Sequence, residues 1–184
     1  STLGMKAKEL GLDLDGPQLA EVVETLKQLE HEGYHFEVAD GSLELLMRRI
    51  IGWTPEWFDV ESFRVITDDT RGVDTLTGET GATVTTEATV KVMVDGKRKI
   101  ATAEGNGPVN ALDRALRTAL NGRYPSLDRV HLTDYKVRVL DTQKGTAAVT
   151  RVLIDSTDGN ATWTTIGVNE NIIEASWQAL LDSI

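Results

Sequence analysis

One short stretch has residue types and spacing suited to binding a small anion. Gly105, Asn106, Gly107, Pro108 and Val109 lie where a predicted β-hairpin gives way to a predicted helix. A glycine-rich turn followed by proline at the first helical position leaves backbone N–H groups exposed at the positive end of the helix dipole. Such a turn can bind a carboxylate. On these residues alone, a plain strand-to-helix connection is the better interpretation.

A second candidate is the run His31-Glu32-Gly33-Tyr34-His35, which satisfies the His-Glu-x-x-His pattern of zinc metallopeptidases. That chemistry needs a continuous helix, so that both histidines bind zinc on one face and the glutamate acts as a base. Gly33 interrupts the run at a predicted helix end, so a solvated helix end is the favoured interpretation. The acidic residues of 67–74 lack the spacing of a calcium loop. We therefore predict no metal site and no catalytic residue.

The elements around these residues begin with a helical region. Apolar residues at helical spacing predict a helix that starts after Asp15 and stops at Gly33. A second helix is predicted over residues 40–50, and a short one before Asp13. Most of the net charge falls in this part of the chain. We therefore expect a small helical linker subdomain over residues 1–58.

The remaining residues, 59–184, are predicted to form a regular α+β domain. Residues 82–94 alternate between apolar and polar side chains, which indicates a half-buried strand. Asp95-Gly96 is a strong hairpin signal, residues 97–104 return as a strand, and a helix follows Pro108. Residues 63–66 supply a preceding strand, and the segment 67–81, which is rich in Thr, Asp and Gly, is predicted to be a loop.

The same order of elements recurs further along the chain. The matching strands are predicted over residues 135–140, 147–156 and 161–168, with a turn at Asp158-Gly159 and a final helix over 173–184. The turn glycines Gly105 and Gly167 occupy matching positions. We therefore predict an α+β fold, in which the helical subdomain is followed by two pseudo-symmetric β-β-β-α units, unit one over 59–126 and unit two over 127–184.

Composition excludes several classes of function. The chain has 184 residues, of which 40% are hydrophobic, so it can bury a substantial core. It contains no cysteine, which excludes disulfides and thiol chemistry and suits a cytoplasmic location. No apolar run could span a bilayer and no signal peptide is visible. The net charge of −10 argues against nucleic acid and anionic membranes as partners.

Two motifs carry a resemblance to a known family. The turn Glu-Gly-Asn-Gly-Pro-Val-Asn-Ala-Leu at 104–112 and the segment 167–176 resemble the C-terminal regulatory domain of the 2-isopropylmalate synthase and citramalate synthase family. The resemblance covers essentially the whole chain. The Glu-x-x-Gly-Tyr-x-Phe-Glu pattern at 30–37 is closer to the citramalate-type branch.

The resemblance implies that this chain is part of a larger enzyme. Family members carry an N-terminal TIM barrel that condenses acetyl-CoA with a 2-oxo acid at a divalent metal ion. Nothing in this sequence matches the barrel. The chain would then be a linker plus regulatory domain that is inactive alone, holds no cofactor of its own, and works with the barrel of the same polypeptide.

The resemblance also implies an effector and a partner. In the family this domain forms a homodimer and binds leucine or isoleucine as a feedback inhibitor, and we expect isoleucine slightly ahead of leucine. The implied site residues are Gly105, Asn106, Gly107, Pro108 and Val109, with Tyr135, Val168 and Asn169 completing the site. The apolar walls would come from Val109, Ala147 or Val168. The alternative is a purely structural dimerisation domain without an effector response.

Overall fold

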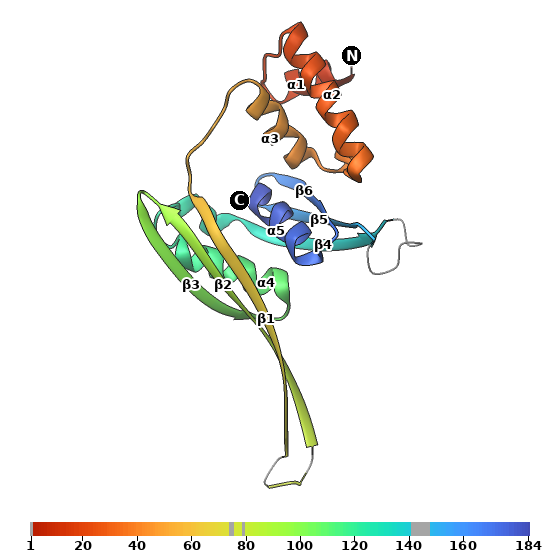
Figure 1. Cartoon of the computed structure of the whole chain (residues 1–184). Helices are drawn as coiled ribbons and strands as arrows, with labels where there is room; N and C mark the ends of the chain where they lie inside the picture. The colour runs from red at the N-terminus through yellow and green to blue at the C-terminus, as the bar shows by residue number, and fades with distance from the viewer. Residues whose placement is uncertain (1, 74–75, 79, 141–147) are drawn as a thin grey trace. The chain divides into compact units, whose positions relative to one another are not determined.

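The computed structural model of the chain describes residues 2–73, 76–78, 80–140 and 148–184. It shows an α+β protein in which a helical region precedes two β-β-β-α units, and this confirms the predicted fold class (Figure 1). The helices and strands are α1 (Thr2–Glu9), α2 (Gly16–Glu32), η1 (Phe36–Val38), α3 (Asp40–Ile50), β1 (Asp59–Val73), β2 (Thr80–Val94), β3 (Lys97–Gly105), α4 (Pro108–Ala119), η2 (Pro125–Arg129), β4 (His131–Val139), β5 (Thr150–Thr157), β6 (Thr162–Asn169) and α5 (Ile172–Ser183).

The chain forms two compact bodies, and each is described by itself. The linker-bearing body contains Ser1–Pro55 and Ser126–Ile184, and the unit-one body contains Glu56–Pro125. The predicted division into a linker subdomain over 1–58 and a domain over 59–184 follows the order of the sequence, and it stays a prediction.

The longest linker helix, α2, begins and ends where its capping residues predict. The Asp15 side chain accepts a hydrogen bond from the backbone N–H of Gln18, and the Gln18 side chain accepts one from the N–H of Asp15, which completes a capping box. Helix α2 stops at Gly33, which adopts the left-handed conformation with φ of 116°. Helix α3 starts at Asp40 as predicted. Val22 of α2 and Met47 of α3, which lie on the apolar faces of these helices, are completely buried.

The unit-one body is an antiparallel sheet of order β1-β2-β3 with α4 packed on one face. Asp95 and Gly96 both have positive φ, at 51° and 72°, as the two-residue hairpin between β2 and β3 requires. Val90 and Val92 of β2 are fully buried with Leu112 and Leu116 of α4. The burial follows the alternation along the strand and the helical spacing of the leucines.

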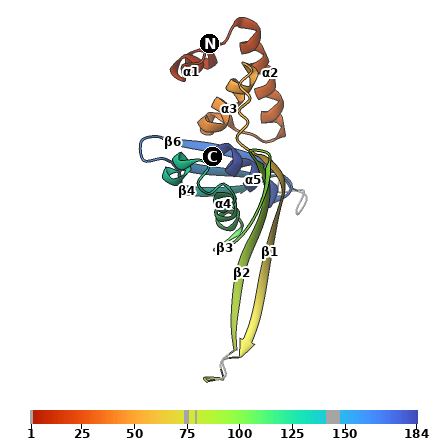
Figure 2. The same ribbon diagram turned by 90° about the vertical axis from the view of Figure 1, so that its left-hand side faces the viewer.

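The prediction of a loop over 67–81 was wrong for most of its length. Strand β1 continues to Val73 and β2 starts at Thr80, and the two strands stay paired over this whole stretch. Because the pairing of β3 ends opposite Thr86, the remainder is a two-stranded ribbon that continues past the sheet (Figure 2). The threonines that recur along both strands of the ribbon favour extended backbone. Val84 lies on this ribbon and is 65% exposed, and positions 74, 75 and 79 lie outside the described residues.

The linker-bearing body contains the second sheet, of order β4-β5-β6. Helix α5 covers one face of this sheet, where Val152 and Ile154 are completely buried. The linker helices cover the other face, where Ile166 and Val168 belong to the same apolar cluster as Val22 of α2. This sheet is therefore covered on both faces. The predicted start of its middle strand, Ala147, lies outside the described residues.

Among the described residues, no helix is long and apolar enough to cross a membrane.

Candidate functional site

The first predicted turn is shaped by a close approach between β3 and α4. A Cβ atom on Gly105 would lie 2.6 Å from Asn110 Oδ1 and 2.8 Å from the Cα of Ala111, so only glycine fits. The backbone N–H of Asn106 donates to Asn110 Oδ1 at 3.0 Å. The first glycine of the turn therefore lets the helix pack closely on the strand.

The start of α4 leaves hydrogen-bond donors without a side-chain cap. Its N-cap is Gly107, in an extended conformation with φ of −173°, which has no side chain to accept a hydrogen bond. Pro108 has no N–H, so the backbone donors in the first turn are those of Val109 and Asn110. A Cβ atom on Gly107 would meet nothing within 4 Å, so the space at the N-cap position is open. The geometry suits a carboxylate.

The second turn repeats the close approach but occupies its own donors. A Cβ atom on Gly167 would overlap the carbonyl group of Ala175 in α5. Asn171 caps α5, because its Oδ1 accepts from the N–H groups of Ile173 at 2.8 Å and Glu174 at 3.3 Å. Asn169 Oδ1 in turn accepts from the N–H of Asn171 at 2.8 Å. The prediction did not include the Asn171 cap, although an Asn just before an apolar helical run is a recognised cap signal.

The predicted site residues fall in different bodies. Residues 105–109 belong to the unit-one body, whereas Tyr135, Val168 and Asn169 belong to the linker-bearing body. Tyr135 is half exposed on β4, and its hydroxyl lies 2.9 Å from Ser176 Oγ. Val168 is buried beneath the linker helices. That these residues line one pocket stays a prediction, and Ala147 lies outside the described residues.

The zinc-like run does not form the helix that its chemistry requires. Helix α2 ends at Glu32, so His31 is helical while His35 follows the left-handed Gly33. The imidazole of His35 lies 3.5 Å from the carboxylate of Glu37, outside the helix. Among the residues that the structure describes, no group of three or more His, Asp or Glu side chains could hold a metal ion.

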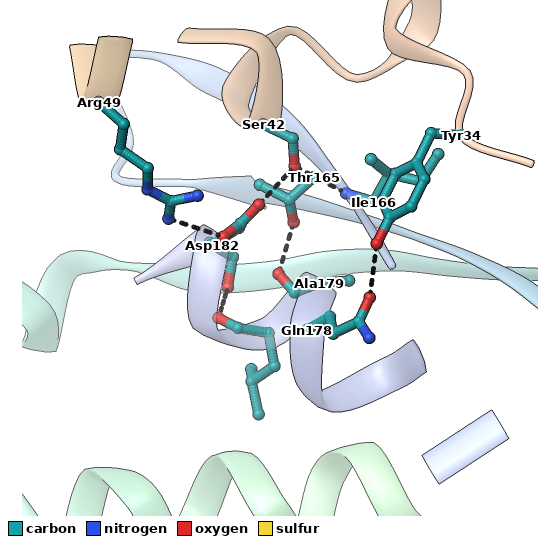
Figure 3. A network of polar contacts seen from close by, with 10 residues as sticks. Tyr34, Ser42, Arg49, Thr165, Ile166, Gln178, Ala179 and Asp182 are labelled. Carbon is teal, nitrogen blue, oxygen red and sulfur yellow. Dashed lines mark hydrogen bonds and ion pairs between the residues drawn. The ribbon is translucent and has the colours of Figure 1, made fainter. Parts of the chain in front are cut away.

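A polar network that sequence analysis missed joins the linker to unit two (Figure 3). It contains four residues that we call the edge latch, namely Tyr34, Asp40, Ser42 and Gln178. Ser42 Oγ donates to Asp182 Oδ2 at 2.9 Å, and the hydroxyl of Tyr34 donates to Gln178 Oε1 at 2.9 Å. These pairs are more than 130 residues apart in sequence, so no local spacing could have indicated them.

Burial affects the ionisation of two groups in this network. The pKa of Asp182 is raised by its removal from water, although the Ser42 hydroxyl and Arg49 oppose this shift. Burial also raises the pKa of Tyr34, and the nearby carboxylates of Asp182 and Glu32 add to the effect. Arg49 lies 3.5 Å from Asp182, whose side chain is 23% exposed. At neutral pH Tyr34 therefore remains a hydrogen-bond donor.

Two surface hollows lie away from the predicted turns. One, of about 500 Å³, is lined by the linker helices and has Leu26, Phe36 and Leu43 among its apolar residues. The other, of about 740 Å³, lies between β3 and the end of α4 and includes Lys97, Lys99 and Arg123. Neither includes a predicted effector residue.

Comparison with known proteins gives consistent matches along the whole chain. The (R)-citramalate synthase of Aquifex aeolicus is 48% identical over 186 residues, which cover 100% of this chain and 34% of that protein. The enzyme of the same name from Streptomyces coelicolor is 48% identical over 100% of this chain and 33% of its own length. That of Sulfolobus acidocaldarius is 36% identical over 96% of this chain and 31% of its own length.

The chain thus spans about a third of the length of these relatives. Their names confirm the resemblance to the citramalate-type branch. The sequence profile of the LeuA allosteric (dimerisation) domain matches residues 37–184, which include α3, both β-β-β-α units and the two turns described above. The chain therefore belongs to the LeuA allosteric (dimerisation) domain family.

Proposed function

We propose that this chain is the regulatory region of a citramalate-type synthase, and that it binds a branched-chain amino acid, isoleucine ahead of leucine, for feedback inhibition. The similarity of the whole chain to about a third of several citramalate synthases supports the placement in such an enzyme. The observation that carries the effector proposal is the difference between the two turns, because one has uncapped donors and the other is capped by its own side chains.

In this proposal the effector carboxylate binds at the start of α4. The N–H groups of Val109 and Asn110 donate to it, and the absence of a side chain at Gly107 lets it approach the backbone. The aliphatic side chain packs on Val109. Tyr135, Val168 and Asn169 belong to the other body, and their part in effector binding stays a prediction.

Titration calorimetry with isoleucine, leucine and valine tests the effector proposal. We expect heat and thermal stabilisation with isoleucine at millimolar levels or below. Gly107→Val should weaken binding at least about tenfold by filling the carboxylate position, because a buried, charge-assisted hydrogen bond contributes about 1.5–3 kcal/mol. Gly81→Val is the matched control, since both glycines have open space at the Cβ position and belong to the same body.

Two results would contradict the effector proposal. If none of the three amino acids gives heat or thermal stabilisation to the wild-type chain, the chain does not sense them. If Gly107→Val and Gly81→Val bind isoleucine as tightly as the wild type, the carboxylate does not lie at the first turn. The first result would favour the second candidate function, a structural dimerisation domain.

Both candidate functions include a homodimer, and the exposed face of β4 supports it. Val137 and Val139 lie on this edge strand and are 41% and 49% exposed. Exposed neighbouring apolar side chains suit burial by a partner. Light scattering at micromolar concentration should give about twice the chain mass of 20.1 kDa. Val139→Asp should lower the measured mass toward that of a single chain. A wild-type monomer would contradict the dimer.

We also propose that the chain alone is catalytically silent and needs no metal ion or other cofactor. The proposal rests on the resemblance, which assigns the acetyl-CoA condensation to a barrel that this sequence does not match. Release of coenzyme A from acetyl-CoA with a 2-oxo acid should not exceed the buffer rate. Stoichiometric zinc in the purified chain, with peptidase activity that Glu32→Gln abolishes, would contradict this proposal.

A further inference from the structure

Strand β6 is the last strand of its sheet, so one row of its backbone donors has no partner strand. The N–H groups of Thr164, Ile166 and Val168 point away from β5, because all three donate to side chains instead. Unpaired strand edges are prone to pairing with other chains, and proteins usually cover them. The partners of these three donors therefore show how this edge is closed.

Side chains close the edge where a further strand would otherwise pair. Thr164 N–H donates to Asp40 Oδ1 at 2.8 Å, and Ile166 N–H donates to Ser42 Oγ at 3.0 Å. Both acceptors belong to the first turn of α3. The third donor, Val168 N–H, bonds Gln178 Oε1 of α5 at 3.2 Å. Two linker side chains and one side chain of α5 thus replace a strand.

Ser42 and Gln178 each make a second hydrogen bond, to another element of the fold. Ser42, which is 4% exposed, accepts from β6 and donates to Asp182 of α5. Gln178 of α5 accepts from the N–H of Val168. It also accepts from the hydroxyl of Tyr34, which follows α2 (Figure 3). Strand, linker and final helix therefore share hydrogen bonds at the same atoms, so moving one element changes the bonds of the other two.

Close packing at the start of α3 makes this contact specific. A Cβ atom on Gly41 would lie 2.9 Å from the carbonyl oxygen of Thr164 and 3.1 Å from Thr165 Cγ2. Helix α3 therefore approaches β6 as closely as backbone permits. Because the two elements are in close contact, small displacements of β6 would lengthen the hydrogen bonds of the latch.

We propose that the edge latch is a regulatory contact, which couples the linker helices α2 and α3 to the end of β6. Val168 is the last of the three edge donors of β6, and the sequence analysis also predicts it as an effector residue. A shift of the end of β6 changes the hydrogen bond to Gln178, and through it the bond to Tyr34. The effector part of this inference rests on the proposed function, whereas the coupling itself does not.

A ligand changes the latch only if it prefers one state over another. The latch is closed when Asp40, Ser42 and Gln178 accept from the edge of β6, and open when these hydrogen bonds are broken. An effector that displaces Val168 would therefore favour the open state. Asp40, Ser42, Tyr34 and Gln178 act here as positioning residues, since none of them is assigned to the effector pocket.

Amide hydrogen exchange on the purified chain tests the coupling without any ligand. Ser42→Ala should raise the exchange rate of Ile166 about tenfold, because its acceptor is lost. It should raise the rates of Val168 and of the α3 amides by a similar factor, although Ser42 accepts from neither. Thr133→Ala is the matched control, since it removes a hydroxyl that bonds the carbonyl of Asp155 on the same sheet. Ser42→Thr keeps a hydroxyl at this position, so its amides should exchange as slowly as those of the wild type.

A faster rate confined to Ile166 in Ser42→Ala, with α3 and Val168 unchanged, would overturn the coupling. Tyr34→Phe gives a second test for the case in which Ser42→Ala fails to fold. It should accelerate exchange at Val168 and in α3 at least about threefold, and unchanged rates at both places would equally overturn the proposal.

Isoleucine separates this inference from the proposed function. If isoleucine binds, it should change the α3 exchange rates in the wild type and not in Tyr34→Phe. If it binds and leaves the wild-type α3 rates unchanged, the effector part of the latch proposal fails while the proposed function stands. If it gives no calorimetric signal, the proposed function fails, and the ligand-free comparison still decides whether the latch couples the two elements.

Discussion

The two β-β-β-α units share one pattern but close the free edge of their third strand differently. In unit two, Asp40 and Ser42 of the linker bond the edge of β6. At the matching edge of β3, the hydrogen bonds within the described part of the unit-one body come from α4, since Arg114 donates to the carbonyl of Glu104 at 3.2 Å and Asn110 accepts from Asn106. The two units therefore have equivalent strand edges, but only the edge of β6 is bonded by linker side chains among the described residues.

The turns that follow these strands differ in the same sense. Asn171 and Asn169 occupy the donors of the second turn, whereas Gly107 leaves those of the first without a side-chain cap. We infer that the repeat has divided its roles, with one unit fixed to the linker and the other retaining donors for a ligand. The following predictions test this difference, from the largest expected effect to the smallest.

The largest effect is expected at the turn glycines. Gly167→Ala should lower the free energy of unfolding by about 3 kcal/mol or more, because its methyl group would overlap the α5 backbone. Gly105→Ala should cost less, because its nearest backbone atom, the N of Ala111, lies 2.5 Å from the Cβ position, farther than the backbone that Gly167→Ala would meet. Urea unfolding of both variants checks the order, and a larger loss for Gly105→Ala would contradict it.

A smaller effect is expected at two left-handed glycines, one at the end of α2 and one shortly after α4. Gly33→Ala should destabilise by about 2 kcal/mol, since it combines a positive φ with a Cβ only 2.8 Å from Leu140 Cδ1. Gly122→Ala is the control, with φ of 76° and open space at the Cβ, and should cost only about 1 kcal/mol. Equal losses in thermal unfolding would show that the linker does not pack closely on the sheet.

Exchanging the helix caps should make the two turns alike. Asn171→Ala should lower stability by about 1 kcal/mol, because two N–H groups of α5 lose their acceptor. Gly107→Asn should raise stability by about 0.5 kcal/mol, because its side chain can cap α4 in the open space there. It should also weaken isoleucine binding by competing with the carboxylate. Denaturation and calorimetry on the same samples test both effects, and tighter binding by Gly107→Asn would contradict the role of the first turn.

The smallest effect is a pH dependence at Asp182. Burial raises the pKa of this carboxyl above its unfolded value, so its contribution to stability is greatest at acidic pH and is lost as pH rises through the folded pKa. Asp182→Asn has no such titration and should gain stability relative to the wild type as pH rises toward neutral. The difference between their unfolding free energies, measured at several pH values, should have this sign. The opposite sign would mean that Arg49 outweighs burial.

Much of the local structure could be predicted from the sequence because it depends on neighbouring residues. The capping box at Asp15 and Gln18, the left-handed stop at Gly33 and the turn at Asp95-Gly96 each involve residues within three positions of one another. The segment 67–81 was mispredicted for the same reason, since its composition resembles a loop. Pairing between the two consecutive strands β1 and β2, which composition alone does not indicate, determines its extended conformation.

The candidate site was predictable only in part. The family turn at 105–109 and the match at 167 could be recognised from spacing, and both glycines are required by packing. The unequal capping of the two turns could be recognised only at Asn171, where a single residue carries the signal.

The sequence by itself determined the order of elements, the repeat and the family, since these follow from periodicity, caps and motifs along the chain. Only the tertiary structure decided that the linker helices close the edge of β6. Ser42 meets Asp182 and Ile166, and Tyr34 meets Gln178, across separations of more than 120 residues. The physical reason is that a strand edge exposes backbone donors identical in every sequence, so their partner depends on which side chain the fold brings within hydrogen-bonding distance.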